Sequence, residues 1–308
     1  MTDHGIDHGI PDPTDPLTPR ARALCDAMSA GFPGPGDAEA LRAASKAGAG
    51  PPVRELDSVS DDVWDGVPIR LYRPHSTTPD DGPLIVFFHG GGWVLCDLDT
   101  HDGLCRELAA RTGAPVVSAG YRLAPEHRFP AAADDAYTVV QQASARWSGP
   151  IVVAGDSSGG NLAAVTALRA PEAIAAQLLF YPALDHRLEG VSAAAYATGF
   201  FHTTAHMRWY WEQYLGPDGD PSDPHASPGL APTLTGLPPA LIVLADCDPL
   251  RDEGLAYARR LAASGVRAEV RLHPGMFHGF LGAAGHLPEA DAALDSAADW
   301  LGRIRTLS

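Results

Sequence analysis

The sequence predicts an α/β domain in which a mostly parallel central sheet is covered by helices on both faces. Short apolar runs without polar alternation recur along the chain, as in LIVFF at 84–88 and IVVA at 151–154. Such runs are typical of strands that are buried on both faces. Stretches with helical spacing separate these runs, and this alternation favours parallel strands joined by crossover helices.

The N-terminal region does not share this alternation. Residues 1–20 are rich in Pro, Asp and Thr and are expected to form a tail. Within the tail, DHGIDHGI brings His4 and His8 together. A metal could bind there, but a solvated tail is the preferred interpretation, and we predict no metal site. Residues 20–48 have helix-like apolar spacing interrupted by GFPGPGD, which predicts cap helices.

From residue 53 onward the elements follow in order. VSDDVWDGVPIRLYRP predicts two strands joined by a tight turn at Asp65-Gly66. Further strands are predicted at 84–88, 115–119, 151–154, 177–181, 240–245 and 268–272. Helices are predicted at 101–112, 131–146, 158–169, 252–264 and 289–303.

One segment, 186–236, contains no convincing strand. It carries an aromatic-rich helix, TTAHMRWYWEQYL, followed by loops rich in Pro and Gly. We interpret it as a cap insertion that covers, with the N-terminal helices, the edge of the sheet where α/β proteins bind ligands. The predicted organisation is a tail and cap helices at 1–52, a first core part at 53–185, the cap insertion at 186–236 and a second core part at 237–308.

Composition narrows the classes of partner. The formal net charge is −16, which disfavours nucleic acid and anionic membrane surfaces, because both attract cationic patches. No apolar run reaches the length of a membrane span. We therefore predict a small-molecule substrate, and the sequence leaves homo-oligomerisation open.

The four cysteines and the N-terminus suggest a compartment. Cys25, Cys96, Cys105 and Cys247 show no C-x-x-C spacing and are interpreted as free thiols, although one bridge stays open. The first 20 residues have no basic segment followed by an apolar one, so we expect no signal peptide and a cytoplasmic location.

The stretch GDSSG, at 155–159, carries the first chemical signal. It fits G-x-S-x-G with Ser157 at the centre, after a predicted strand and before a predicted helix. In that context the turn exposes a nucleophilic serine. A glycine-rich turn or a phosphate cradle is the alternative. The only lysine is Lys46, so no phosphate-binding G-x-x-x-x-G-K-[ST] motif overlaps the stretch.

A nucleophilic serine needs a base, an orienting acid and oxyanion donors. Downstream, LADCDPLRDEG offers Asp246, Asp248 and Asp252 after one strand. RLHPGMFHGF offers His273 and His278 after the last strand. Upstream, HGGGW places Gly90 to Gly92 after another strand, where backbone N–H groups could meet an oxyanion.

These motifs resemble a known family. HGGGW (89–93), YRLAPEHRFPAA (121–132), GDSSGGNLAA (155–164), DPLRDEG (248–254) and HGF (278–280) are similar to the bacterial hormone-sensitive lipase family, or family IV, of carboxylesterases with the α/β-hydrolase fold. The resemblance implies a catalytic triad and an oxyanion hole without cofactor. The implied triad is Ser157, Asp248 and His278, with Asp246 and His273 as bystanders. The implied oxyanion donors are the N–H groups of Gly90, Gly91 and Ser158, and the family usually has alanine where this chain has Ser158.

The loop YRLAPEHRFP is predicted to be rigid and locked by an Arg122–Glu126 ion pair. The resemblance suggests that its two proline bonds, Ala124-Pro125 and Phe129-Pro130, are both cis.

The resemblance implies a serine carboxylesterase, and the aromatic cap suggests short- to medium-chain acyl esters. Met207, Tyr210, Trp211 and Tyr214 share one face of the predicted helix. The predicted pocket residues are Trp93, Phe200, Phe201, Met207, Tyr210 and Trp211. Plain packing of the cap onto the body is the alternative for these rings. An amidase or deacetylase with the same triad, and a non-catalytic small-molecule receptor on the same fold, are the rival functions.

Overall fold

The apolar runs form the centre of one eight-stranded sheet with the order β1-β2-β4-β3-β5-β6-β7-β8. The computed structural model describes residues 14–50, 52, 54–75 and 81–304. All neighbouring strands from β4 to β8 pair in parallel. These strands are β3 (Leu84–Phe88), β4 (Val116–Ala119), β5 (Ile151–Asp156), β6 (Ala176–Phe180), β7 (Ala240–Cys247) and β8 (Ala268–Phe277). The predicted fold class is confirmed.

The first two strands form the predicted hairpin. β1 (Ser58–Trp64) and β2 (Val67–Arg73) are antiparallel, and β2 also pairs antiparallel with β4. Asp65 and Gly66 both have positive φ, 49° and 86°, as a two-residue hairpin turn of the primed type requires.

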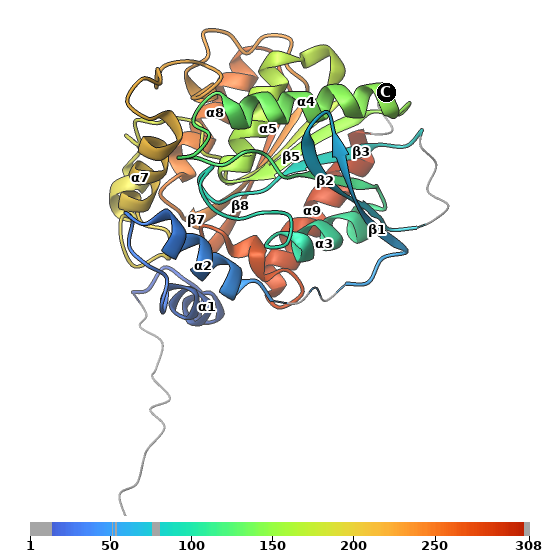
Figure 1. The fold of residues 1–308 in the computed structure, drawn as a ribbon. Coiled ribbons are helices and arrows are strands. Elements are labelled where there is room, and N and C mark those ends of the chain that lie inside the picture. The colour runs from blue at the N-terminus through green and yellow to red at the C-terminus, as the bar shows by residue number, and fades with distance from the viewer. Residues whose placement is uncertain (1–13, 51, 53, 76–80, 305–308) are drawn as a thin grey trace, which may run out of the picture.

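Helices cover both faces of the sheet (Figure 1). α3 (Asp102–Thr112) and α9 (Pro288–Ile304) pack on one face. α4 (Ala131–Arg146), α5 (Ser158–Arg169) and α8 (Arg251–Ala263) pack on the other. In β3, Val86 and Phe88 face the second layer whereas Ile85 and Phe87 face the first. The unbroken apolar run of β3 therefore reflects burial on both faces.

β8 is longer than predicted. The sequence pattern ended at 272 because Pro274 and Gly275 interrupt it, yet the strand continues to Phe277. β8 is an edge strand that pairs only with β7 among the described strands, and an edge strand tolerates a proline that donates no hydrogen bond. A register shift between Ala245 and Cys247 of β7 lets pairing resume at Cys247–Phe277.

The two segments predicted to form a cap lie far apart in sequence but contact each other in the structure. α1 (Pro19–Ser29), α2 (Ala38–Gly48) and α7 (Thr204–Leu215) gather at one end of the molecule in Figure 1. The Arg22 guanidinium donates to the Gly199 carbonyl at 2.8 Å, and His206 Nε2 lies 3.0 Å from the Pro33 carbonyl oxygen. α6 (Val191–Ala195) and the short turns Pro171–Ala173, Pro228–Leu230 and Phe280–Ala283 complete the elements.

In the loop after β4, both predicted cis bonds, Ala124-Pro125 and Phe129-Pro130, are present. The predicted Arg122–Glu126 pair is wrong. Arg122 pairs with Asp135 at the start of α4, 2.8 Å away, and Glu126 pairs with Arg42 of α2 at 2.7 Å. Proximity in sequence was misleading because the two side chains leave the loop toward different helices.

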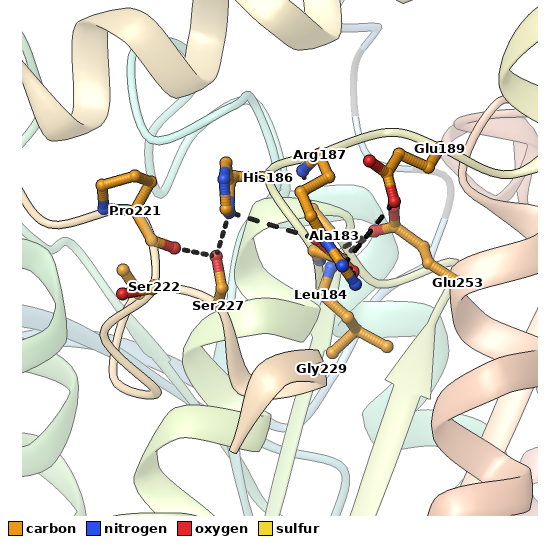
Figure 2. A network of polar contacts seen from close by, with 12 residues as sticks. Ala183, Leu184, His186, Arg187, Glu189, Pro221, Ser222, Ser227, Gly229 and Glu253 are labelled. Atoms are coloured by element: carbon orange, nitrogen blue, oxygen red, sulfur yellow. Dashed lines mark hydrogen bonds and ion pairs between the residues drawn. The ribbon is translucent and has the colours of Figure 1, made fainter. Parts of the chain in front are cut away.

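The half-buried carboxyl of Glu253 lies where the segment after β6 meets α8. Figure 2 shows Glu253 of α8 against Leu184, whose N–H donates to Glu253 Oε1 at 2.6 Å. Asp185 N–H reaches the same oxygen at 3.4 Å, and its own carboxylate binds Arg187. Burial raises the pKa of Glu253 well above its usual value, and the negative charge of Asp185 adds to the effect although the backbone donors oppose it. The Glu253 carboxyl thus accepts two backbone N–H groups while it lies near the carboxylate of Asp185.

Candidate active site

Ser157 occupies a strained turn between β5 and α5. Its φ of 54° and ψ of −118° lie outside the regions that a side chain adopts freely. Glycines on both sides allow the turn, because a Cβ on Gly155 would collide with the Gly159 backbone and one on Gly159 would collide with the Phe88 carbonyl. Close approach of α5 to β3 and β5 is therefore what sets the sequence G-x-S-x-G here.

The structure brings Ser157, His278 and Asp248 into one hydrogen-bonded row. Ser157 Oγ lies 2.9 Å from His278 Nε2, and His278 Nδ1 lies 2.8 Å from Asp248 Oδ2. Asp248 Oδ1 accepts the Leu250 N–H at 2.8 Å. All three are buried, at 8%, 3% and 0% exposure. The row joins the C-terminal ends of β5, β7 and β8, and β6 lies between β5 and β7 in the sheet.

The two predicted bystanders lie outside this row. Asp246 pairs with Arg251 at 3.2 Å. His273 packs its ring against Phe280, with the centroids 5.5 Å apart.

The glycine turn after β3 differs from the prediction in one residue. The Gly90 N–H donates to Asp156 Oδ1 at 2.8 Å. It already has a hydrogen-bond acceptor, so the prediction that it serves as an oxyanion donor is wrong. Gly91 and Gly92 instead line the cavity in front of Ser157, and no backbone acceptor faces either N–H within residues 81–304. The Ser158 N–H belongs to the first turn of α5, where helix donors lack intrahelical partners.

Asp156 ties the glycine turn to the serine turn. Besides the Gly90 N–H, its Oδ1 lies 3.2 Å from His101 Nε2. Burial alone would raise the pKa of Asp156, but the interaction with His101 and their hydrogen bond lower it overall. The buried carboxylate therefore stays charged and fixes the first glycine next to Ser157.

A cavity of about 470 Å³ opens in front of the serine. Of the six predicted pocket residues, Phe201, Met207 and Tyr210 line it. Residues that were not predicted also line it, among them Phe32 from the α1–α2 loop, His101 and His202. Phe32 and His202 sit in irregular segments, where no periodicity marks the inward face.

Trp93, Phe200 and Trp211 do not line this cavity, and the prediction for them is wrong. Trp93 stacks on Tyr214 with centroids 4.2 Å apart and touches Trp211 at 4.5 Å. These rings form the core beneath α7. Phe200 turns toward α1, where Arg22 lies 5.4 Å over its ring. The shared face of α7 is real, but only its N-terminal part reaches the cavity.

Comparison with known proteins identifies the family. Residues 85–282 match the model of a family described as alpha/beta hydrolase fold, and this range contains Ser157, Asp248 and His278. The chain belongs to the α/β-hydrolase fold family. Its resemblance to the hormone-sensitive lipase family is confirmed.

Several relatives of this hydrolase are enzymes named for ester hydrolysis. The ethyl acetate hydrolase of Pseudomonas putida is 39% identical over 257 residues, covering 78% of this chain and 81% of the relative. The esterase LipI of Mycobacterium tuberculosis is 41% identical over 266 residues, covering 79% and 80%. A solved structure of a hyperthermophilic esterase from the archaeon Pyrobaculum calidifontis has a TM-score of 0.86 and 37% identity, covering 94% of this chain and 99% of the other.

The other sequence predictions concern metals, membranes and thiols. Across the residues that the structure describes, no group of three or more His, Cys, Asp or Glu side chains is placed to hold a metal ion; His4 and His8 lie outside those residues. None of the described helices combines the length and apolar character needed to cross a bilayer. All four cysteines of this hydrolase are free, as predicted.

Proposed function

We propose that this carboxylic ester hydrolase is a serine carboxylesterase that cleaves short- to medium-chain acyl esters through an acyl-enzyme intermediate. The observation that carries the proposal is the row Ser157–His278–Asp248, because its serine end opens into the cavity beside Gly91 and Gly92. A small-molecule ester is the proposed partner, and a cytoplasmic location stays a prediction.

The nucleophile is activated through the histidine. A carboxylate only accepts hydrogen bonds, so Asp248 favours the tautomer with a proton on His278 Nδ1. Nε2 then accepts the Ser157 hydroxyl proton as Oγ attacks the ester carbonyl carbon. The buried Asp248 stabilises the imidazolium that forms.

Backbone donors take up the charge that develops on the carbonyl oxygen. We assign this role to the N–H groups of Gly91, Gly92 and Ser158, since the Gly90 N–H serves Asp156. Donors of this kind act strongly when they are preorganised, and removal of one typically costs about 10²–10³ in kcat. Asp156 contributes by fixing the glycine turn through the Gly90 N–H.

His278 completes both half-reactions. Its Nε2 proton passes to the leaving alcohol as the tetrahedral intermediate collapses to the acyl-enzyme. The same nitrogen then deprotonates a water that attacks the acyl carbonyl, which releases the acid and restores Ser157. The chemistry needs no cofactor, because the chain supplies nucleophile, base and oxyanion donors.

The proposed acyl range follows from the cavity. Its walls include Met207, Phe201 and Tyr210, and its volume is about 470 Å³. Burial of each methylene gains about 0.8 kcal/mol until the space is filled. We therefore expect kcat/KM to rise from acetyl to butyryl or hexanoyl esters and to fall for long chains.

The test measures turnover of a 4-nitrophenyl butyrate and of the matching anilide. We expect the ester to be cleaved, and Ser157→Ala to lose about 10⁴-fold or more of kcat. Ser158→Ala is the matched control, because it keeps the backbone N–H and should retain most of kcat. Preferential cleavage of the anilide would favour the amidase alternative. Saturable binding without turnover in the unmodified protein would favour a receptor.

A further inference from the structure

His202 is an imidazole in the cavity wall that the proposed mechanism does not use. It lies just before α7, and its ring stands perpendicular to that of His278, with the centroids 5.6 Å apart. The rings of Phe32 and Phe201 lie 5.4 and 4.3 Å from it. A polar side chain thus stands among apolar ones, next to the proposed base.

The hydrogen bonds of His202 differ from those of its neighbour His206. His206 uses both nitrogens, since Nδ1 lies 2.8 Å from Thr203 Oγ1 and Nε2 lies 3.0 Å from the Pro33 carbonyl. His202 has one long contact, from Nδ1 to the Tyr210 hydroxyl at 3.5 Å. In the described part of the chain, nothing hydrogen-bonds its Nε2.

The imidazole is neutral in this setting and presents a donor. Burial lowers the pKa of His202 well below its usual value, and the nearby His278 and His206 lower it further. Neutral imidazole has one N–H donor and one acceptor nitrogen. Because the Tyr210 hydroxyl can donate to Nδ1, the matching tautomer carries its proton on Nε2. Because His202 is half-buried and lines the cavity, an acceptor oxygen of a bound ligand can take this N–H in place of water.

The position of His202 indicates which portion of a bound ester it faces. In the mechanism proposed above, the leaving oxygen must receive its proton from His278 Nε2, so the alcohol portion of the ester lies next to His278. The oxyanion glycines hold the carbonyl oxygen instead. A group that packs against the His278 ring therefore faces the alcohol portion.

We propose that His202 is a specificity-determining residue that hydrogen-bonds an acceptor oxygen in the alcohol portion of the ester. The favoured substrates are then esters of alcohols that carry an ether, hydroxyl or carbonyl oxygen two or three bonds beyond the scissile oxygen. This inference rests on the proposed esterase function.

The test compares two esters of nearly equal shape, 2-methoxyethyl butyrate and butyl butyrate. Their kcat/KM ratio is measured for the unmodified enzyme and for His202→Leu, so that the intrinsic reactivity of the two alcohols cancels. We expect the ratio to fall about three- to tenfold in the variant, as for loss of one neutral hydrogen bond. His202→Phe, a ring without an N–H, should lower it equally and serves if the leucine variant does not fold.

Two controls separate this effect from a change of shape. Met207→Leu alters another side chain that lines the cavity without removing a hydrogen-bonding atom, and it should leave the ratio within about twofold of the unmodified enzyme. Acyl chain-length preference at a fixed alcohol should not change in His202→Leu. An unchanged ratio in both His202 variants, or an equal fall in Met207→Leu, would overturn the inference while the esterase function stood. If the unmodified enzyme hydrolysed neither of the two esters, both the inference about His202 and the proposed esterase function would be overturned.

Discussion

Shortening Tyr210 to alanine should move the acyl-chain optimum toward longer acids. The Tyr210 ring lies directly against the glycine turn, because a Cβ on Gly92 would collide with it. It also lines the cavity. Removal of the ring therefore opens space beside the proposed oxyanion donors. Each methylene that enters this space gains about 0.8 kcal/mol, which is about fourfold in kcat/KM. If the vacated space buries two more methylenes of the octanoyl chain, the ratio of kcat/KM for octanoate to that for butyrate should rise roughly fifteenfold.

The assay is kcat/KM over a series of 4-nitrophenyl esters from acetate to decanoate, with Trp211→Ala as the matched control. Trp211 is a buried ring on the same helix, but it packs on Trp93 and does not line the cavity. Its truncation should lower stability by about 3–5 kcal/mol, as for other buried rings, and leave the chain-length profile unchanged. An unaltered profile in Tyr210→Ala, or the same shift in both variants, would refute the reasoning.

Three further changes test how the site is held. Gly92→Ala places a Cβ into the Tyr210 ring at a φ of 61°, so kcat should fall about 10²-fold or more through loss of a proposed oxyanion donor; near-normal kcat would exclude Gly92 from that role. Arg42→Met removes bonds from α2 to the Val94 and Ala124 carbonyls and to Glu126; we expect a raised KM and a lower melting temperature with kcat little changed, and a fall in kcat alone would contradict it. The raised pKa of Glu253 means that the folded state binds a proton that the unfolded state has released, so stability falls as pH rises above the unfolded value of about 4.3. Glu253→Gln should therefore flatten the decline of melting temperature between pH 5 and 8, and an equally steep decline in the variant would show that another group causes it.

The sequence predicted those parts of the fold that depend on local pattern. The runs 84–88 and 151–154 predicted strands because both of their faces are apolar, and they became β3 and the first part of β5. The order of serine, acid and base motifs after separate strands pointed to residues that the structure joins in one row. Local pattern located these motifs because each directly follows a strand of one parallel sheet, whereas the family resemblance was needed to choose Asp248 and His278 among the acids and histidines on offer.

Pairings between distant segments could not be read in the same way. The Gly90 N–H is taken by Asp156 because β3 and β5 are neighbours in the sheet, with Phe88 opposite Gly155. Sequence shows two strand ends but not that these two are adjacent. Helical spacing likewise identified the buried face of α7, yet whether Trp211 meets a cavity or Trp93 depends on what lies opposite.

The residues proposed to carry out catalysis and those proposed to set selectivity lie on different kinds of backbone segment. Ser157, Asp248 and His278 directly follow β5, β7 and β8, whose positions are fixed by ladders of parallel hydrogen bonds. Phe32 and His202 stand on irregular segments of the cap, which the ladders do not constrain. A substitution in that wall changes packing at the cavity without moving the strand ends. If the proposed role of His202 holds, substrate preference depends on a residue that lies outside the family motifs that carry the triad.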